Sequence, residues 1–206
     1  MIDALIYDMG NVLVRWDPHA LALAGSEDPA DASVLEKALF ASPDWIKGDL
    51  GLFGPEEMFA AARLRVPARL EPALRALCFQ WPDWLEPLPG AADFVARANK
   101  RGLKGYLLSN ASRRFPQALA RCFPAFSLLD GWVVSAHEGV VKPDIRIYRR
   151  LLERYDLDPR RCFFIDDVPA NLEGARRAGM DGWLFDGDFS ALERALLDRG
   201  VSLEVN

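Results

Sequence analysis

The sequence predicts an α/β protein: a Rossmann-like parallel sheet core with a small all-helical cap inserted after the first strand. Three observations predict this fold. From about residue 90 onward, short apolar runs alternate with helical patterns, which is typical of parallel strands joined by crossover helices. Residues 19 to about 81 show helical patterns alone. The chain has 206 residues and 50% hydrophobic content, so it can bury a sizeable core.

The first strand is predicted at residues 5–7, where apolar residues follow one another without alternation, as in a buried parallel strand. Asp8 comes next and therefore lies at the carboxyl end of that strand, where open α/β sheets bind ligands. Gly10 then permits a backbone turn. Residues 12–18 are expected to extend away from the sheet, with Pro18 ending any strand pairing.

The helical region is predicted from three segments, residues 31–40, 56–64 and 70–79, which have apolar residues at helical spacing and few β-branched residues. Prolines stand at the helix starts or in the connections. The proline-rich stretch 81–90 is the expected return hinge. We therefore expect a helical cap at 19–87 and an α/β core made of residues 1–18 and 88–206.

The remaining strands are predicted where apolar runs recur between helices. Helices are expected at 91–101, up to about 121, at 143–155, 170–178 and 190–199, and strands at 105–109, 132–135, 162–165 and 182–185. Polar residues follow these strands or precede a helix: Ser109 and Asn110, Lys142, and the pair Asp166 and Asp167. Each residue by itself could be a helix cap or a solvated surface group. Together with Asp8 they meet at one edge of one sheet.

A hydroxyl, an ammonium and several carboxylates at one sheet edge suit a phosphate group and a cation. Three carboxylates and a phosphate dianion carry far more charge than Lys142 offsets. Two like charges ~4 Å apart repel by roughly 4 kcal/mol at an effective dielectric of 20, so the site needs a divalent cation. Oxygen ligands alone indicate Mg²⁺, held by Asp8, the carbonyl of Gly10, Asp166 and Asp167.

The other roles follow from the same chemistry. Asp8 is the expected nucleophile, which attacks phosphorus to form an aspartyl phosphate. Lys142 offsets the charge of nucleophile and phosphate. The phosphoryl oxygens are expected to be bound by Ser109, Asn110 and the neighbouring residues Gly10 and Asn11.

Four ordered motifs resemble those of the haloacid dehalogenase (HAD) superfamily: residues 8–13, 108–110, 141–144, and 164–167 followed by Asn171. The resemblance covers the predicted core and implies a Mg²⁺-dependent hydrolase of small phosphomonoesters. Residues 19–87 are similar in position and helical character to the cap of this superfamily. Residues 142–148 also resemble the branch that contains small sugar-phosphate phosphatases, among them α-glucose-1-phosphate phosphatases. That branch implies a sugar phosphate as substrate.

One position departs from the phosphatase pattern. Phosphatases of this superfamily usually carry a second aspartate two residues after the nucleophile, and here that residue is Gly10. General acid-base help is typically worth ~10²–10⁴ in rate. We therefore expect either that Asp17 partly substitutes, although it could instead cap the next helix, or that the substrate leaves readily, as a sugar 1-phosphate does.

Two other functions fit part of the pattern. A 2-haloacid dehalogenase resembles the chain in its aspartate nucleophile, serine and lysine, and it needs no metal. The pair Asp166 and Asp167 disfavours it, because adjacent carboxylates have no role in holding a carboxylate substrate. A catalytically idle phosphate-binding relative is the other alternative, and Gly10 is its best support.

The composition limits the classes of molecule that the protein is expected to bind. The formal net charge of −5 gives no electrostatic reason to expect binding to nucleic acid or anionic lipid. No apolar segment is long enough to span a membrane, and the three cysteines lack metal-type spacing. We expect a cytoplasmic protein whose partner is a small phosphorylated metabolite; the oligomeric state cannot be read. Trp16, Trp45 and Trp84 lie where a cap could close over substrate.

Overall fold

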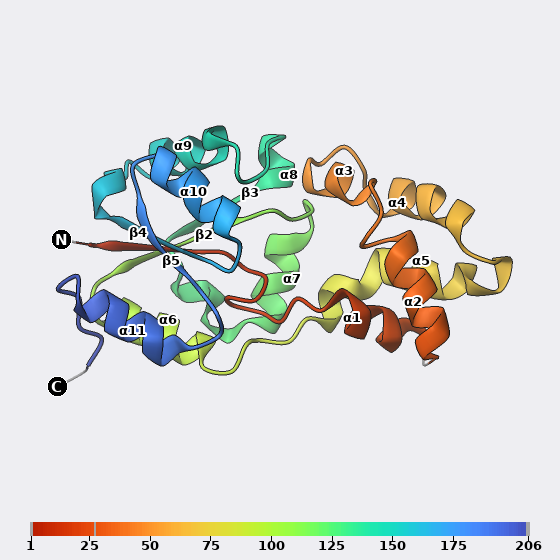
Figure 1. The fold of residues 1–206 in the computed structure, drawn as a ribbon, viewed down its shortest axis with the longest axis horizontal. Coiled ribbons are helices and arrows are strands. Elements are labelled where there is room, and N and C mark those ends of the chain that lie inside the picture. The colour runs from red at the N-terminus through yellow and green to blue at the C-terminus, as the bar shows by residue number, and fades with distance from the viewer. Residues whose placement is uncertain (1, 27, 205–206) are drawn as a thin grey trace.

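The computed structural model describes residues 2–26 and 28–204. A five-stranded parallel sheet lies at one end of the molecule, and a helical insertion lies at the other (Figure 1). The strands occur in the spatial order β3-β2-β1-β4-β5, which puts β1 at the centre of the sheet. Their bounds are β1 Ala4–Tyr7, β2 Lys104–Ser109, β3 Gly131–Val134, β4 Cys162–Asp166 and β5 Asp181–Leu184.

The two faces of the sheet are buried in separate apolar clusters. In β1, Leu5 and Tyr7 belong to one cluster, and Ala4 and Ile6 belong to the other. Successive strand residues point to opposite faces, so a run of consecutive apolar residues is what a strand covered on both sides requires. This explains why the sequence around β1 shows no alternation.

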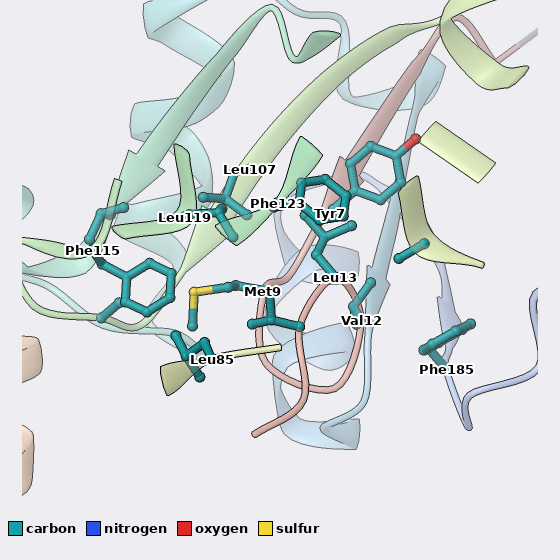
Figure 2. Packing of buried hydrophobic residues seen from close by; sticks show 14 of the residues in the cluster. Tyr7, Met9, Val12, Leu13, Leu85, Leu107, Phe115, Leu119, Phe123 and Phe185 are labelled. Atoms are coloured by element: carbon teal, nitrogen blue, oxygen red, sulfur yellow. The ribbon is translucent and has the colours of Figure 1, made fainter. Parts of the chain in front are cut away.

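Helices cover both faces, as expected for parallel strands. Helices α9 and α10 lie on one side, and α6, α7 and α11 lie on the other (Figure 1). Figure 2 shows part of the apolar cluster that contains Tyr7. In it, Leu13 and Met9 lie among side chains from β1, β2 and α7. The bounds are α6 Ala91–Lys100, α7 Phe115–Cys122, α8 Ser135–Glu138, α9 Ile145–Arg154, α10 Pro169–Arg177 and α11 Phe189–Leu197.

In the described residues between β1 and α6, the regular elements are helices, joined by turns and by isolated β-bridges at Val14. The insertion contains α1 Pro18–Ser26, α2 Pro29–Ala38, α3 Trp45–Asp49, α4 Pro55–Ala62 and α5 Glu71–Gln80, with short 3₁₀ turns between and after them. Two chain segments join the insertion to the sheet, and they are hydrogen-bonded to each other. Arg15 N donates to Glu86 O at 2.8 Å, and Leu88 N donates to Leu13 O at 2.9 Å. Within residues 2–26 and 28–204, no helix combines the length and apolar character needed to cross a bilayer.

The predicted fold class is confirmed. Each of the five strands begins and ends within one residue of its predicted range. The parallel sheet is flanked by helices. Three helices were not predicted: α1, α3 and α8. Helices α3 and α8 span five and four residues, too short to show a periodic pattern. The division at residues 18 and 88 into core and cap stays a prediction.

Candidate active site

The carboxyl ends of β1, β2 and β4 meet at a cavity of about 210 Å³ between the sheet and the helical insertion. Its walls on the sheet side include Asp8, Ser109, Asn110, Lys142 and Asp167. Parallel strands put their carboxyl ends at one edge, so residues more than a hundred positions apart come together here. The backbone turn after Asp8 contributes Gly10 and Asn11, and the insertion and its linker contribute Trp16, Trp45, Asp49 and Trp81.

Lys142 binds two carboxylates at the base of the cavity. Its Nζ lies 2.7 Å from Asp8 Oδ1 and 2.7 Å from Asp166 Oδ2, and it donates to the carbonyl of Leu108 at 3.0 Å. An ammonium has three hydrogens, so all of its donors are used. Burial alone would lower the pKa of Lys142, but the charges of Asp8 and Asp166 outweigh burial and raise that pKa. Lys142 is therefore a fixed cation of the site.

Asp8 is buried, and burial is the main reason that its pKa rises to about 6. Lys142 lowers this pKa through charge and a hydrogen bond, whereas the charge of Asp166 raises it. Around neutral pH the carboxylate is charged and ion-paired. Such a group can attack an electrophile without first losing a proton.

The adjacent carboxylates Asp166 and Asp167 have different surroundings. Asp166 is fully buried: its Oδ1 accepts from Val168 N at 2.8 Å and from Asn171 Nδ2 at 3.0 Å, while its Oδ2 accepts from Lys142. Asp167 is less buried and lines the cavity. One of its oxygens, Oδ2, accepts from Asn11 Nδ2 at 3.0 Å. Asp167 is therefore the more accessible carboxylate of the pair, whereas Asp166 is held by three protein donors.

The site can hold a divalent cation. Asp8, Asp166 and Asp167 each offer a carboxylate oxygen, and these oxygens all lie within 4.8 Å of one another. Three like charges at such distances repel, and Lys142 alone does not balance them. A donor set made only of oxygens matches Mg²⁺. The residues present therefore fit the metal that the sequence predicted.

The side chains of Asn11 and Asn110, two residues expected to bind phosphate, hold other parts of the site, and phosphate binding by these residues stays a prediction. Asn110 Oδ1 accepts from Lys142 N at 2.7 Å, and Asn110 Nδ2 donates to Lys142 O at 3.0 Å. Asn11 has positive φ, donates to Asp167 and accepts from Trp16 N at 3.1 Å. Both line the cavity, but their side-chain polar atoms are engaged with protein. Their side chains position Lys142 and Asp167.

Ser109 remains suited to a phosphoryl oxygen. Its side chain is buried, it lines the cavity, and its hydroxyl contacts Met9 Sδ at 3.8 Å. Sulfur is a weak acceptor, so a charged oxygen would replace that contact at little cost.

The expectation for Asp17 needs correction. Asp17 does not line the cavity; its Oδ1 accepts from Ala20 N at 3.0 Å, at the beginning of α1. An aspartate before a helix satisfies a free backbone N–H in this way, so capping explains the residue. The missing second aspartate is not replaced by Asp17 in this structure.

Asp49, at the end of α3, is the carboxylate that the sequence analysis missed. It lines the cavity opposite the sheet. Burial, then the nearby charge of Asp8, raises the pKa of Asp49 to about 7. Its backbone is fastened to the core, because Ser135 Oγ donates to Asp49 O at 2.6 Å. No motif marks this residue, and its position depends on how the insertion packs.

Aromatic rings form the wall above the site. Trp16, Trp45 and Trp81 pack with centroid separations of 5.7 Å for Trp16 and Trp45, 5.2 Å for Trp16 and Trp81, and 5.6 Å for Trp45 and Trp81. All three line the cavity. Trp84, which was also expected near the substrate, packs against the hydrophobic core instead.

Known proteins resemble the chain in sequence. The sequence model of the haloacid dehalogenase-like hydrolases matches residues 2–179. A phosphatase of Mycobacterium tuberculosis is 35% identical over 99 residues, which cover 48% of the chain and 46% of that relative, so the alignment spans about half of it. A sesquiterpene phosphatase of Aspergillus oryzae is 24% identical over 87% of both chains.

Solved structures share the fold. A HAD-family enzyme of Bacteroides thetaiotaomicron, in an aspartate-to-alanine mutant complexed with magnesium and inorganic phosphate, has a TM-score of 0.74 and 20% identity. The match covers 93% of this chain and 99% of that one. An L-2-haloacid dehalogenase of Xanthobacter autotrophicus has a TM-score of 0.66 and 19% identity, over 96% of this chain and 83% of that one.

Proposed function

Because the chain belongs to the haloacid dehalogenase-like hydrolase family, we propose that it is a magnesium-dependent phosphomonoesterase that works through an aspartyl-phosphate intermediate. The observation that carries the proposal is the Asp8 carboxylate, ion-paired at 2.7 Å with Lys142 beside a small cavity that Asp167 also lines. A nucleophile, a cation and a second carboxylate in one cavity suit phosphoryl transfer. Two related proteins are named as phosphatases, which supports this class of substrate.

The metal would be held by Asp8, Asp167 and the carbonyl of Gly10, all three in residues that line the cavity. Asp166 would serve a different role, because its oxygens are already engaged by Lys142, Asn171 and Val168. A bound Mg²⁺ supplies charge neutralisation and a fixed orientation for the phosphoryl group.

In the first half-reaction, an oxygen of Asp8 forms a bond to phosphorus while the bond from phosphorus to the alcohol oxygen breaks. Ser109 would donate its hydroxyl hydrogen to a phosphoryl oxygen, since its present contact with Met9 Sδ is long, at 3.8 Å. Lys142 keeps Asp8 ionised and oriented. Donors fixed in advance lose little free energy in reorganisation when charge develops on the transferred group.

Asp49 would supply the proton that the missing aspartate cannot. A protonated Asp49 gives its proton to the departing alcohol oxygen. In the second half-reaction, Asp49 takes a proton from the water whose oxygen attacks phosphorus. The bond between phosphorus and Asp8 then breaks, which releases inorganic phosphate and restores the Asp8 carboxylate. The pKa of Asp49, raised by burial and by Asp8 to about 7, lies near the value that serves both directions of transfer at neutral pH.

A 2-haloacid dehalogenase is the rival activity. It shares the aspartate nucleophile, and a dehalogenase is among the proteins of similar fold, but 19% identity carries the fold alone. The carboxylate of Asp167 on the cavity wall favours a cation site, because it would repel a carboxylate substrate.

The test measures phosphate and chloride release by the purified protein. Acetyl phosphate and n-butyl phosphate are supplied with Mg²⁺ or with EDTA, and 2-chloropropionate is supplied in parallel. We expect phosphate release that requires Mg²⁺, no chloride release, and loss of all turnover in Asp8→Asn. Asp17→Asn is the matched control, because asparagine also caps a helix and the residue lies outside the cavity.

Each contrary result has a distinct meaning. Chloride release without metal would make the protein a dehalogenase. Release of neither phosphate nor chloride from any substrate would make it an idle relative. Full phosphate release by Asp8→Asn would exclude the covalent intermediate.

A further inference from the structure

A second cavity of about 370 Å³ adjoins the first, between the helical insertion and the core loop after β2. The two cavities share three lining residues, Trp45, Asp49 and Trp81. The first cavity is small, and a phosphoryl group and a metal would occupy the polar groups on its sheet side. The second has the size typical of a small-molecule pocket.

We propose that the second cavity binds the alcohol part of the substrate and selects phosphate esters of apolar alcohols over sugar phosphates. This inference rests on the proposed phosphatase activity and names its substrate class. It departs from the sugar phosphate that the sequence resemblance implied. Three features of the cavity carry it: its position next to the first cavity, its lining and its rigidity.

The adjacent positions of the two cavities set where each part of a phosphate ester would lie. With the phosphoryl group beside Asp8 and the alcohol in the second cavity, the bridging oxygen falls at the shared wall. Asp49 belongs to that wall. An alcohol placed in the second cavity therefore departs next to the carboxyl group assigned to protonate it.

Apart from Asp49, the side chains that the insertion contributes to the cavity are apolar. They include Trp45, Phe53, Met58, Cys78 and Trp81. Burial raises the pKa of the Cys78 thiol to about 12, so this residue adds no charge. A sugar ring would bury several hydroxyl groups against these side chains without partners, which costs free energy for each unpaired group. An alkyl or terpenoid chain loses nothing there and gains from leaving water.

Besides Asp49 on the shared wall, the cavity has two charged residues, which come from the core loop and do not reverse this preference. Arg113 is exposed to solvent. Arg114 is partly buried, and its guanidinium donates to the carbonyl of Phe79 at 2.8 Å. The aliphatic stems of both arginines can cover apolar ligand surface while their charged ends stay solvated or paired.

The cavity is held in shape by contacts of the turn after α3 with the core. Gly51 has φ +71°, and a Cβ atom there would lie 2.2 Å from Ala136 O, so this turn lies directly on the α8 backbone. Ser135 Oγ donates to Asp49 O at 2.6 Å just before the turn. A preformed cavity lets an apolar group bind without first ordering the chain.

The experiment compares esters that differ only in the alcohol. The wild-type protein with Mg²⁺ is assayed on n-alkyl phosphates from ethyl to octyl and on glucose 1-phosphate and glucose 6-phosphate, with acetyl phosphate as a compact reference. We expect kcat/KM to rise about fourfold for each added methylene until the cavity is filled. Octyl phosphate should exceed both glucose phosphates by at least tenfold. Equal kcat/KM along the alkyl series, or a preference for the sugars, would overturn the proposal.

Two variants test the cavity itself. Cys78→Phe fills it, so the ratio of kcat/KM for octyl phosphate to that for ethyl phosphate should fall at least tenfold. Phe53→Ala enlarges it and should move the optimum to longer chains. Cys122→Phe is the matched control on α7, because Cys122 lines neither cavity. A ratio within one preparation does not depend on how much of the variant folds.

Failure of this inference and failure of the proposed function give different results. Magnesium-dependent hydrolysis of acetyl phosphate with no dependence on chain length would leave the phosphatase standing and reject the apolar cavity. No hydrolysis of any ester would reject the phosphatase. If the ratio of kcat/KM for octyl phosphate to that for ethyl phosphate is unchanged in both Cys78→Phe and Phe53→Ala, the alkyl chain binds outside this cavity.

Discussion

Trp16 occupies the space into which a side chain at position 10 would extend. A Cβ atom built on Gly10 would lie 3.2 Å from Trp16 Cβ and 3.6 Å from Trp16 Cγ. The Trp16 backbone is also held, because its N–H donates to Asn11 Oδ1 at 3.1 Å. Glycine at position 10 is therefore coupled to a tryptophan that packs into the aromatic wall of the site.

This contact predicts that Gly10→Asp will not restore a second catalytic aspartate. An aspartate there must push against Trp16, so its carboxylate will not reach the leaving oxygen in a relaxed geometry. We expect turnover of n-butyl phosphate to stay equal or to fall, both in the wild-type protein and in an Asp49→Asn background. Steady-state kinetics on the two variants checks this. A rise of tenfold or more in the Asp49→Asn background would show that the site adapts.

The acid-base assignment predicts a split between substrates in Asp49→Asn. An amide cannot donate a proton as an acid does, so turnover of n-butyl phosphate should fall by ~10²-fold or more. Acetyl phosphate has a leaving group that needs no proton, so its turnover in the same variant should fall far less. The matched variant Asp17→Asn should show no such split. A uniform loss on both esters would point to a general distortion of the cavity.

The core part of this site could be predicted from sequence because its residues follow local patterns. Each of Asp8, Ser109 and Asp167 comes directly at or after a short apolar strand, and parallel strands bring such ends together. Those patterns do not reveal the hydrogen-bond partner of each side chain. The side chain of Asn110 makes two hydrogen bonds to the backbone of Lys142, 32 residues away, and no spacing rule reveals this pairing.

The insertion was less predictable for a physical reason. Its longer helices show periodicity, but α3 spans five residues and carries Asp49 at its last position. Whether that carboxylate faces the site depends on packing of the α3 turn against Ala136 and on the Ser135 hydrogen bond. The Ser135 hydrogen bond spans 86 residues, and neither contact has a local signature in the sequence.

Asp49 also predicts how the metal-free protein responds to pH. Burial, then the charge of Asp8, raises the pKa of Asp49 from 3.8 to about 7. The folded protein therefore binds this proton more tightly than the unfolded chain does, so the free energy of unfolding falls as pH rises from about 4 to about 7. Each unit by which the pKa is raised corresponds to about 1.4 kcal/mol in the free energy of unfolding. Solvent near the partly exposed carboxylate makes the total change smaller.

Asp49→Asn removes this titration. In EDTA, the stability of the variant relative to wild type should increase by ~1–2 kcal/mol between pH 5 and pH 8. Urea unfolding at the two pH values measures the difference. A constant difference between variant and wild type across this range would mean that the folded state does not raise the pKa of Asp49.

The different surroundings of Asp166 and Asp167 predict separate phenotypes. Asp167→Asn should raise the Mg²⁺ concentration for half-maximal activity at least tenfold with little loss of stability, because Asp167 lines the cavity and has one protein donor. Asp166→Asn should instead lower the free energy of unfolding by ~3 kcal/mol, since it removes a partner of buried Lys142. Magnesium titration and urea unfolding distinguish the two. Equal shifts in Mg²⁺ dependence would make both residues direct ligands.

The hydrogen bond from Ser135 to the backbone of Asp49 predicts a coupling that a double-mutant cycle can measure. Ser135→Ala removes a fully buried hydroxyl that donates to Asp49 O at 2.6 Å and accepts from Ala111 N at 3.0 Å. Loss of the first contact frees the end of α3, so we expect kcat for n-butyl phosphate to fall ~10-fold. Loss of the second leaves a buried N–H unpaired, which costs about 1–3 kcal/mol of stability.

These two effects separate in an Asp49→Asn background. There the group that Ser135 positions no longer transfers a proton, so adding Ser135→Ala should leave kcat for n-butyl phosphate almost unchanged, while the stability cost remains. A purely structural serine would lower kcat by the same factor in both backgrounds. Acetyl phosphate serves as the internal reference, because its turnover does not depend on the proton from Asp49. An additive cycle would mean that Ser135 acts on the site without Asp49.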